Sequence, residues 1–419
     1  MRVRSMRRLF PALLAVAVLS SCAMAEPNVI TAEEVRREVP ENPPVAETVR
    51  GLTSFGHALF AATASPGANA VLSPLSIGYA FGLARAGAVA DTATELDEVF
   101  GFPSAGPHTS LNALTRQIIT TEDPPPPPAP GAERDARDTP APAIVGMANG
   151  LFTQEGLSVR AEFLRTLAAQ YGTGVHQVDF TGDGAKVIDA WAEERTAGRI
   201  RKVFDNLSPR TRLVIANAVY LRAEWTTPFI EPPEEGASFT RADGTTVRTA
   251  LMRRDGGLPY AAGPGWQAVE LRYAGGDLAM WVLVPQAGGS PGDLLSPAVM
   301  ARVAAGLRER PVRLAMPRWD FSTSLDLAEP LGKLGLRETD YSGITDGASL
   351  EQAVHRANIT VNEWGTEAAA VTGLAFAVSA PATPEAEVRA DHPFAFAIVH
   401  RPTLTPLFIG QVGDPAARD

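Results

Sequence analysis

The sequence has a single cysteine, Cys22, among its 419 residues, so no disulfide within the chain can stabilise the fold. Its six histidines show no metal-ligand spacing, and the sequence contains no CxxC motif, phosphate-binding loop or dinucleotide fingerprint. No metal or cofactor is therefore expected. The formal net charge is −10, which repels phosphate backbones and argues against nucleic acid as a partner.

The N-terminus contains an apolar run, Leu9–Leu19, that follows a basic start and is too short for a transmembrane helix. This pattern is typical of a signal peptide. It ends in Leu19-Ser20-Ser21-Cys22, which resembles the cleavage box of bacterial lipoproteins. We predict a signal peptide over residues 1–21, lipidation of Cys22, and a membrane anchor in the cell envelope, at the outer membrane on its periplasmic or surface face. An ordinary cut near Ala25 is the alternative, and it would give a secreted protein.

Two segments have low complexity. Residues 22–45 are rich in Pro, Glu and Ala and are predicted to be a tether. Residues 122–142 begin with a proline run and are predicted to be an extended surface insertion within one domain. Residues 46–417 mix helical and strand patterns without a repeating βαβ rhythm, which indicates a single α+β domain.

Hydrophobic periodicity predicts the main elements of this domain. The helices are expected at residues 48–62, 76–100, 161–171 and 187–196. The strands are expected at residues 143–152, 213–221, 268–271, 278–284, 312–317, 394–400 and 407–412.

A hydrolase has to be considered because Gly288-Gly289-Ser290-Pro291-Gly292 matches the G-x-S-x-G pattern after a predicted strand. In that motif the residue after the serine donates its backbone N–H to the oxyanion. Pro291 has no N–H, so we interpret the segment as a loop.

The segment from Thr366 to Ser379 is unusual. It carries no charge after Glu367 and no proline before Pro381. As a strand it would place Thr366, Ala368 and Ala370 on one face and Glu367 on the other. A short helix capped by Thr366 fits the same residues, and the pattern does not choose between the two.

The residues from Val361 to Ala370 resemble the hinge of the reactive loop of the serpin family. Further blocks resemble that family in order and spacing. They are Ser73-Pro74-Leu75-Ser76-Ile77, Ala216-Asn217-Ala218-Val219-Tyr220-Leu221 with Trp225, His392-Pro393-Phe394-Ala395-Phe396, and Pro406-Leu407-Phe408-Ile409-Gly410. The resemblance covers about residues 46 to 415.

The resemblance implies a serpin fold of three β-sheets with eight to nine helices and an exposed reactive loop at about residues 363–390. A serine protease cleaves this loop, which then inserts into the main sheet and traps the acyl-enzyme. The protein would thus be an inhibitor and not an enzyme, without a cofactor, and a monomer. A non-inhibitory binding or carrier serpin is the alternative.

The resemblance also implies roles for single residues. The hinge comprises Glu363, Gly365, Thr366, Glu367, Ala368, Ala369 and Ala370. The polar shutter cluster comprises Ser73, Ser76, Asn217 and His355, and Trp225 belongs to the breach beside the top of the sheet.

Counting from the hinge places the cleaved bond between Ser379 and Ala380, whereas counting back from Pro393 points nearer Ala382. The tip is small and uncharged and has no Arg or Lys for a trypsin-like pocket. We therefore expect elastase-, chymotrypsin- or subtilisin-like serine proteases as targets, with cysteine proteases as a further class.

Overall fold

The computed structural model describes residues 28–121, 139–204, 207–208, 211–367 and 383–417. The predicted signal peptide, Cys22 and most of the proline-rich insertion lie outside the described residues, as do loop residues 368–382. The helices are α1 (Val45–Thr63), α2 (Pro74–Arg85), α3 (Ala90–Phe100), α4 (His108–Ile118), α5 (Ala161–Thr166), the π-helix η1 (Leu167–Tyr171), α6 (Gly184–Arg195), the 3-10 helix η2 (Gly292–Leu295), α7 (Pro297–Gly306) and α8 (Ala328–Leu334).

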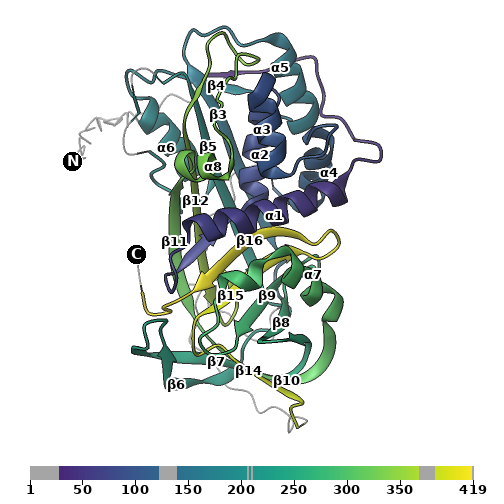
Figure 1. Cartoon of the computed structure of the whole chain (residues 1–419), viewed down its shortest axis with the longest axis vertical. Coiled ribbons are helices and arrows are strands. Elements are labelled where there is room, and N and C mark those ends of the chain that lie inside the picture. The colour runs from purple at the N-terminus through teal and green to yellow at the C-terminus, as the bar shows by residue number, and fades with distance from the viewer. Residues whose placement is uncertain (1–27, 122–138, 205–206, 209–210, 368–382, 418–419) are drawn as a thin grey trace, which may run out of the picture.

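The main sheet runs along the long axis of the molecule (Figure 1). Its strands, in spatial order, are β1 (Asn28–Ile30), β4 (Val175–Val178), β3 (Ile144–Gln154), β5 (Leu213–Glu224), β13 (Gly365–Thr366), β12 (Leu350–Asn362) and β11 (Trp319–Asp326). Strands β5 and β12 also pair directly with each other, in parallel, beyond the end of β13. The main sheet therefore contains a short strand placed between two longer ones.

The remaining strands form one hydrogen-bonded network around the long strand β7. They are β14 (Ala386–Arg389), β10 (Arg308–Pro317), β7 (Thr246–Gly263), β8 (Trp266–Arg272), β9 (Leu278–Pro285), β15 (Phe394–His400), β16 (Thr405–Val412) and β2 (Ala70–Leu72), with β6 (Glu231–Thr240) paired to β7. The first part of β7 pairs with β6 and β10, and its end pairs with β8, so β7 links two sheets. With the main sheet these make three, which confirms the predicted α+β fold of three sheets with at least eight helices.

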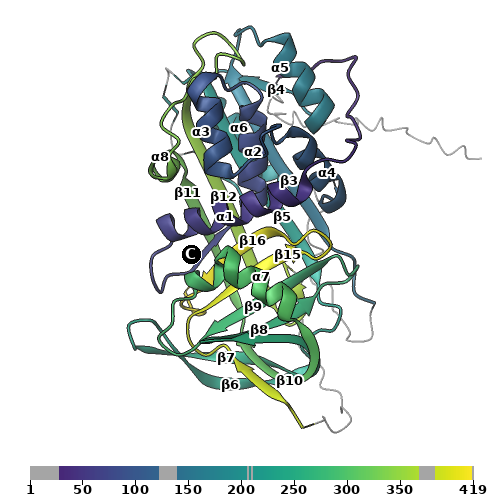
Figure 2. The same cartoon turned by 45° about the vertical axis from the view of Figure 1, so that its right-hand side comes forward.

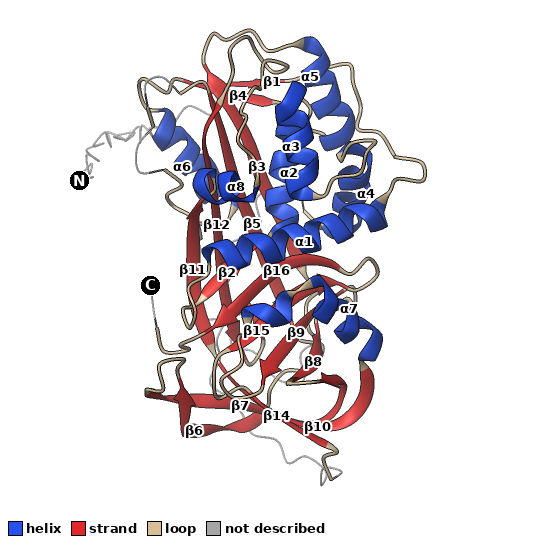
Figure 3. Ribbon diagram, in the orientation of Figure 1, coloured by secondary structure: helices blue, strands red, loops and turns tan. Residues whose placement is uncertain are grey.

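Alternate residues of β5 face two different cores. Leu213 and Ile215 belong to the large core shared with α1 and α2, whereas Val214 and Ala216 pack with Ile188 of α6. Because side chains alternate along a strand, this apolar run has both faces covered. The turned view in Figure 2 shows helices α1 to α4 over the upper part of the molecule, and Figure 3 shows β6, β7, β10 and β14 at its lower end.

The single helix predicted over residues 76–100 is wrong, because α2 and α3 are separated by a turn at residues 86–89. Gly87 lies against Ile344 so closely that a Cβ would lie 2.2 Å from its Cγ1 atom. Ala90 then has a φ of 47°, which is a left-handed conformation that no continuous helix contains. The apolar period runs through both helices because both pack on the same core. The other predicted helices and strands are present, with ends shifted by a few residues.

Residues 28–44 do not form the predicted tether, because they are bound along the domain. Strand β1 pairs antiparallel with β4 at the edge of the main sheet. Arg37 Nε donates to Asn112 Oδ1 on α4 at 3.0 Å, and the Glu38 backbone N–H donates to the Ala169 carbonyl at 2.7 Å. The polar residues that suggested a solvated segment instead form hydrogen bonds with α4 and η1.

Within the residues that the structure describes, no helix is both long enough and apolar enough to cross a bilayer.

Candidate functional site

The hinge begins inside the main sheet. Gly365 pairs with Glu224 of β5 and Asn362 of β12, and Thr366 pairs with Ala223 and Val361. A Cβ on residue 365 would lie 2.1 Å from the Ala223 carbonyl oxygen, and its φ of 155° disfavours other residues, so glycine is required there. Gly365 and Thr366 of the predicted hinge are thus already between β5 and β12.

Thr366 is held by an aromatic pair. Its side chain is buried, and its hydroxyl lies 2.6 Å from the Tyr273 hydroxyl. The Tyr273 ring stacks on Trp225 at 4.5 Å between centroids, and Trp225 Nε1 donates to the Asn362 carbonyl at 3.0 Å. Burial raises the pKa of Tyr273, so its hydroxyl stays protonated and can donate to Thr366. Trp225, the predicted breach residue, therefore contacts the hinge through Tyr273 and through β12.

The turn before Gly365 is fixed by backbone and charged contacts. The Trp225 and Phe229 backbone N–H groups donate to the carbonyls of Trp364 and Glu363, at 2.8 and 2.9 Å. The Glu363 carboxylate accepts a hydrogen bond from Arg318 Nε at 2.6 Å. These contacts bind the start of the hinge to the end of β5 and to the residue before β11.

Glu367 is the one charged hinge residue within the core. Its side chain is only 5% exposed, and its backbone N–H donates to the Thr360 carbonyl at 2.9 Å. Its carboxylate lies 3.5 Å from Arg199 Nε, in the turn after α6. Burial raises the pKa of Glu367 to about 7, against the opposing effect of Arg199. The sequence pattern separates Glu367 from the face of Thr366 but gives no sign that it is buried.

The four predicted shutter residues lie together beneath the main sheet. The Ser73 backbone N–H donates to His355 Nε2 at 3.1 Å, so His355 Nδ1 carries the proton and donates to Asn217 Oδ1 at 2.5 Å. Asn217 Nδ2 donates in turn to the Ser76 hydroxyl at 2.6 Å and also contacts Asn149. The cluster joins β12, β5, β3 and the start of α2, so opening the sheet between β5 and β12 would break the bond from His355 to Asn217.

The remaining predicted site residues lie outside the described part of the chain. They are Cys22, Ala368, Ala369, Ala370, Ser379 and Ala380.

Buried titratable groups predict how stability depends on pH. Burial lowers the pKa of His108 and His176 to about 4 and that of His355 to about 3, whereas that of Glu367 is raised to about 7. The unfolded chain therefore binds more protons at the histidines, and their contribution to stability is present above about pH 6.5 and lost as pH falls. Glu367 acts in the opposite sense, and its contribution is lost as pH rises from about 4.5 to above 7.

Near pH 5.5, unfolding lets each of the three histidines bind about one proton and makes Glu367 release about one, so the chain takes up about two protons in total. We expect the free energy of unfolding to fall by about 2 kcal/mol per pH unit between pH 6 and 5. Urea denaturation at several pH values measures this slope. The variant His176→Gln should reduce this slope to about half. An equal slope in both proteins would contradict a contribution from His176.

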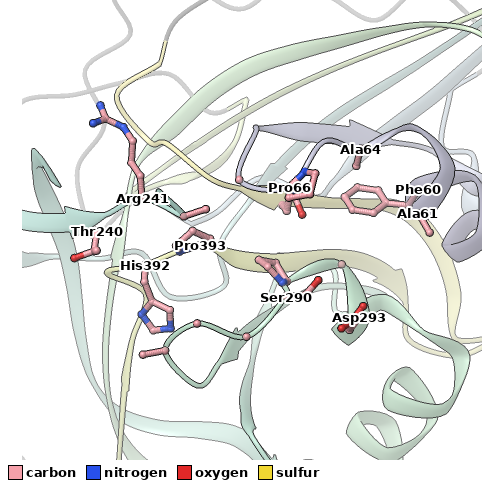
Figure 4. A pocket seen from close by; sticks show the side chains of 18 of the residues that line it. Phe60, Ala61, Ala64, Pro66, Thr240, Arg241, Ser290, Asp293, His392 and Pro393 are labelled. Carbon is pink, nitrogen blue, oxygen red and sulfur yellow. The ribbon is translucent and has the colours of Figure 1, made fainter. Parts of the chain in front are cut away.

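Ser290 lies at a cavity of about 630 Å³ between the end of α1 and the loops that carry Arg241 and His392 (Figure 4). His392 cannot act as its base, because Nε2 lies 2.8 Å from the Pro285 carbonyl, which only accepts, and must therefore carry a proton. Its Nδ1 lies 3.0 Å from Asp391 Oδ1. With Pro291 unable to donate to an oxyanion, the G-x-S-x-G match lacks the backbone donor that its chemistry requires.

Three sheets, two of them linked by β7, with the start of a C-terminal loop inserted between β5 and β12 of the third, define a serpin. The chain belongs to this family: the model of serpins (serine protease inhibitors) matches residues 50–415.

Similar proteins span nearly the whole chain. An uncharacterized serpin-like protein of Thermococcus kodakarensis is 32% identical over 398 residues, covering 92% of this chain and 89% of its own. The leukocyte elastase inhibitor of Bos taurus is 31% identical over 374 residues, covering 84% and 94%. The solved structure of the thermophilic serpin tengpin in its native state has a TM-score of 0.80 at 20% identity, covering 93% of this chain and all of that one.

Proposed function

We propose that this serpin is an irreversible suicide inhibitor of serine proteases that acts by loop cleavage and insertion. The observation that carries the proposal is the position of Gly365 and Thr366 between β5 and β12. Beyond the end of β13 the facing edges of β5 and β12 pair with each other, so a further strand has a defined path between them. Ala368 to Ala370 follow Glu367 in the chain, and their small side chains suit that path.

In the proposed reaction the protease supplies the chemistry. Its serine oxygen attacks the carbonyl carbon of Ser379, the bond to Ala380 breaks, and Ala380 leaves as a free amine. The acyl-enzyme formed on Ser379 is then carried along as the loop enters the sheet. Each inserted residue can exchange backbone hydrogen bonds with β5 and β12, and these bonds stabilise the inserted state.

The proposed targets have shallow, uncharged specificity pockets, because the residues around Ser379 are Ala377, Val378 and Ala380. Elastase- and subtilisin-like proteases fit best. The similarity to a leukocyte elastase inhibitor supports the same choice. We further propose that the domain acts as a monomer held at an envelope membrane by a lipid on Cys22.

The test mixes the chain from Pro27 onward with elastase and subtilisin. A denaturing gel should show a stable band at the summed mass, and mass spectrometry should find a released peptide that begins at Ala380. Inhibition of trypsin-like enzymes alone would overturn the assignment of targets. Complete loop cleavage with a fully active protease would show that the loop is only a substrate, and the binding or carrier function would then be preferred.

A further inference from the structure

Glu367 is the first hinge residue beyond the inserted strand, and it occupies an unfavourable position for a carboxylate. Its φ is 52°, in the left-handed region that side chains other than glycine avoid at a cost of about 1 kcal/mol. Its Oε2 atom is buried and accepts no hydrogen bond from the described residues, although Arg199 lies 3.5 Å away. An ionised group in such a site has lost water without full compensation.

The charged and titratable groups around Glu367 come from three elements. Arg199 approaches from the turn after α6, Arg222 and Tyr220 lie on β5, and Asp320 lies on β11. The two arginines favour the ionised carboxylate, whereas Asp320 and burial oppose it. Arg199 is the group in ion-pair contact, and its side chain is 34% exposed, so it can stay solvated while it faces the buried acid.

We propose that Arg199 and Glu367 form a proton-dependent latch that sets whether the start of the hinge is inserted in the main sheet or released to solvent. Arg199 is a positioning residue, since it acts on the hinge only through Glu367. The protonated carboxyl stays in the sheet, and the ionised carboxylate stays only with Arg199 as its counter-ion. That the latch controls presentation of the loop to a protease rests on the proposed inhibitory function, whereas the latch itself does not.

The direction of the pH effect follows from the two environments. In the inserted state the pKa of Glu367 is about 7, whereas in a released hinge it returns to its solvent value. The inserted state therefore holds the proton over a pH range in which the released state has lost it. Raising the pH favours release, and the equilibrium constant for release should rise about tenfold between pH 6 and pH 8. Lowering the pH returns the hinge to the sheet.

Hydrogen exchange measures this equilibrium without a protease. Release breaks the hydrogen bonds from the Trp225 and Phe229 amides to the hinge, and the bond from the Glu367 amide to Thr360. Peptides that cover residues 225–229 and 360–367 should therefore lose protection about tenfold from pH 6 to 8, after correction for intrinsic exchange rates. Peptides from β15, which lies in another sheet, serve as the internal reference.

Three variants separate the latch from a merely structural role. Glu367→Gln is neutral at every pH, so its protection should not change with pH. Arg199→Gln should match the wild type at pH 6, where Glu367 is mostly protonated, and should release the hinge further at pH 8. Arg199→Lys keeps the charge and should restore most of the wild-type protection.

Equal pH dependence in the wild type and Glu367→Gln would overturn the latch, and so would equal behaviour of the two Arg199 variants. The failure of the proposed function looks different. A chain with the expected exchange that leaves elastase active has the latch without inhibition. A chain that traps elastase but whose hinge peptides show the same hydrogen-exchange protection at pH 6 and pH 8 is an inhibitor without the latch.

Discussion

If the proposed inhibitory function holds, replacing Thr366 with arginine is expected to turn the protein into a protease substrate. Thr366 is 2% exposed, and its hydroxyl contacts Tyr273 in the aromatic core next to Trp225. A guanidinium there would be buried without a counter-ion, at a cost of several kcal/mol. Because about 1.4 kcal/mol corresponds to a tenfold change, the yield of trapped protease should fall by about 100-fold or more. Titration of elastase against the variant measures the number of serpin molecules consumed for each protease inactivated.

Two variants serve as controls. Thr366→Ser keeps the hydroxyl within reach of Tyr273 and should trap protease as the wild type does. Thr246→Arg adds the same charge at the exposed start of β7 and should have no effect. If Thr366→Arg still formed a full yield of stable complex, insertion of Thr366 would not be part of the inhibitory step.

The second large effect is expected at His355, whose replacement by alanine should release the main sheet from its closed state. The change removes the acceptor for the Ser73 amide and the donor to Asn217, both in a fully buried cluster. Two unsatisfied buried groups cost about 1–3 kcal/mol each. We expect the variant to form latent or polymeric species on warming under conditions in which the wild type remains an active monomer. Native gels and size-exclusion chromatography follow this conversion.

His400→Ala is the matched control. His400 is also a buried histidine, but it lies at the end of β15 in another sheet, and its Nδ1 atom bonds locally, to Thr403. It should lower stability without promoting latent or polymeric forms. A His355→Ala protein that stayed monomeric after prolonged warming would contradict the role of the shutter cluster.

The sequence predicts much of this fold because its strongest signals are local. The apolar runs of β5, β9 and β15 are buried on both faces, so their composition alone marks them as strands. Strand β12 carries a weaker signal. Ala353, His355, Ala357, Ile359 and Val361 alternate with Val354 and the polar residues Arg356, Asn358 and Thr360, and these five are buried. His355 interrupts the alternating apolar pattern, although it occupies one of the buried positions.

The hinge contacts could not be predicted from the sequence, since they join segments far apart in the chain. Tyr273 follows β8, Arg318 precedes β11 and Arg199 lies in the turn after α6, and each meets a hinge residue only in the folded sheet. None has a distinctive sequence neighbourhood. The binding of residues 28–44 to the domain also could not be predicted, because their local composition points the wrong way. Their polar composition is that of a solvated segment, but the polar side chains have partners on α4.

The pairing of β1 with β4 fixes the direction in which an anchored molecule would face. Strand β1 lies at one end of the long axis, and β14, the first strand after the loop, lies at the other (Figure 3). If a lipid on Cys22 holds the chain, the β1 end faces the bilayer and the β14 end faces the surrounding solution. In the proposed function, a protease would then approach from the side away from the lipid headgroups, and once captured it would stay at the envelope membrane.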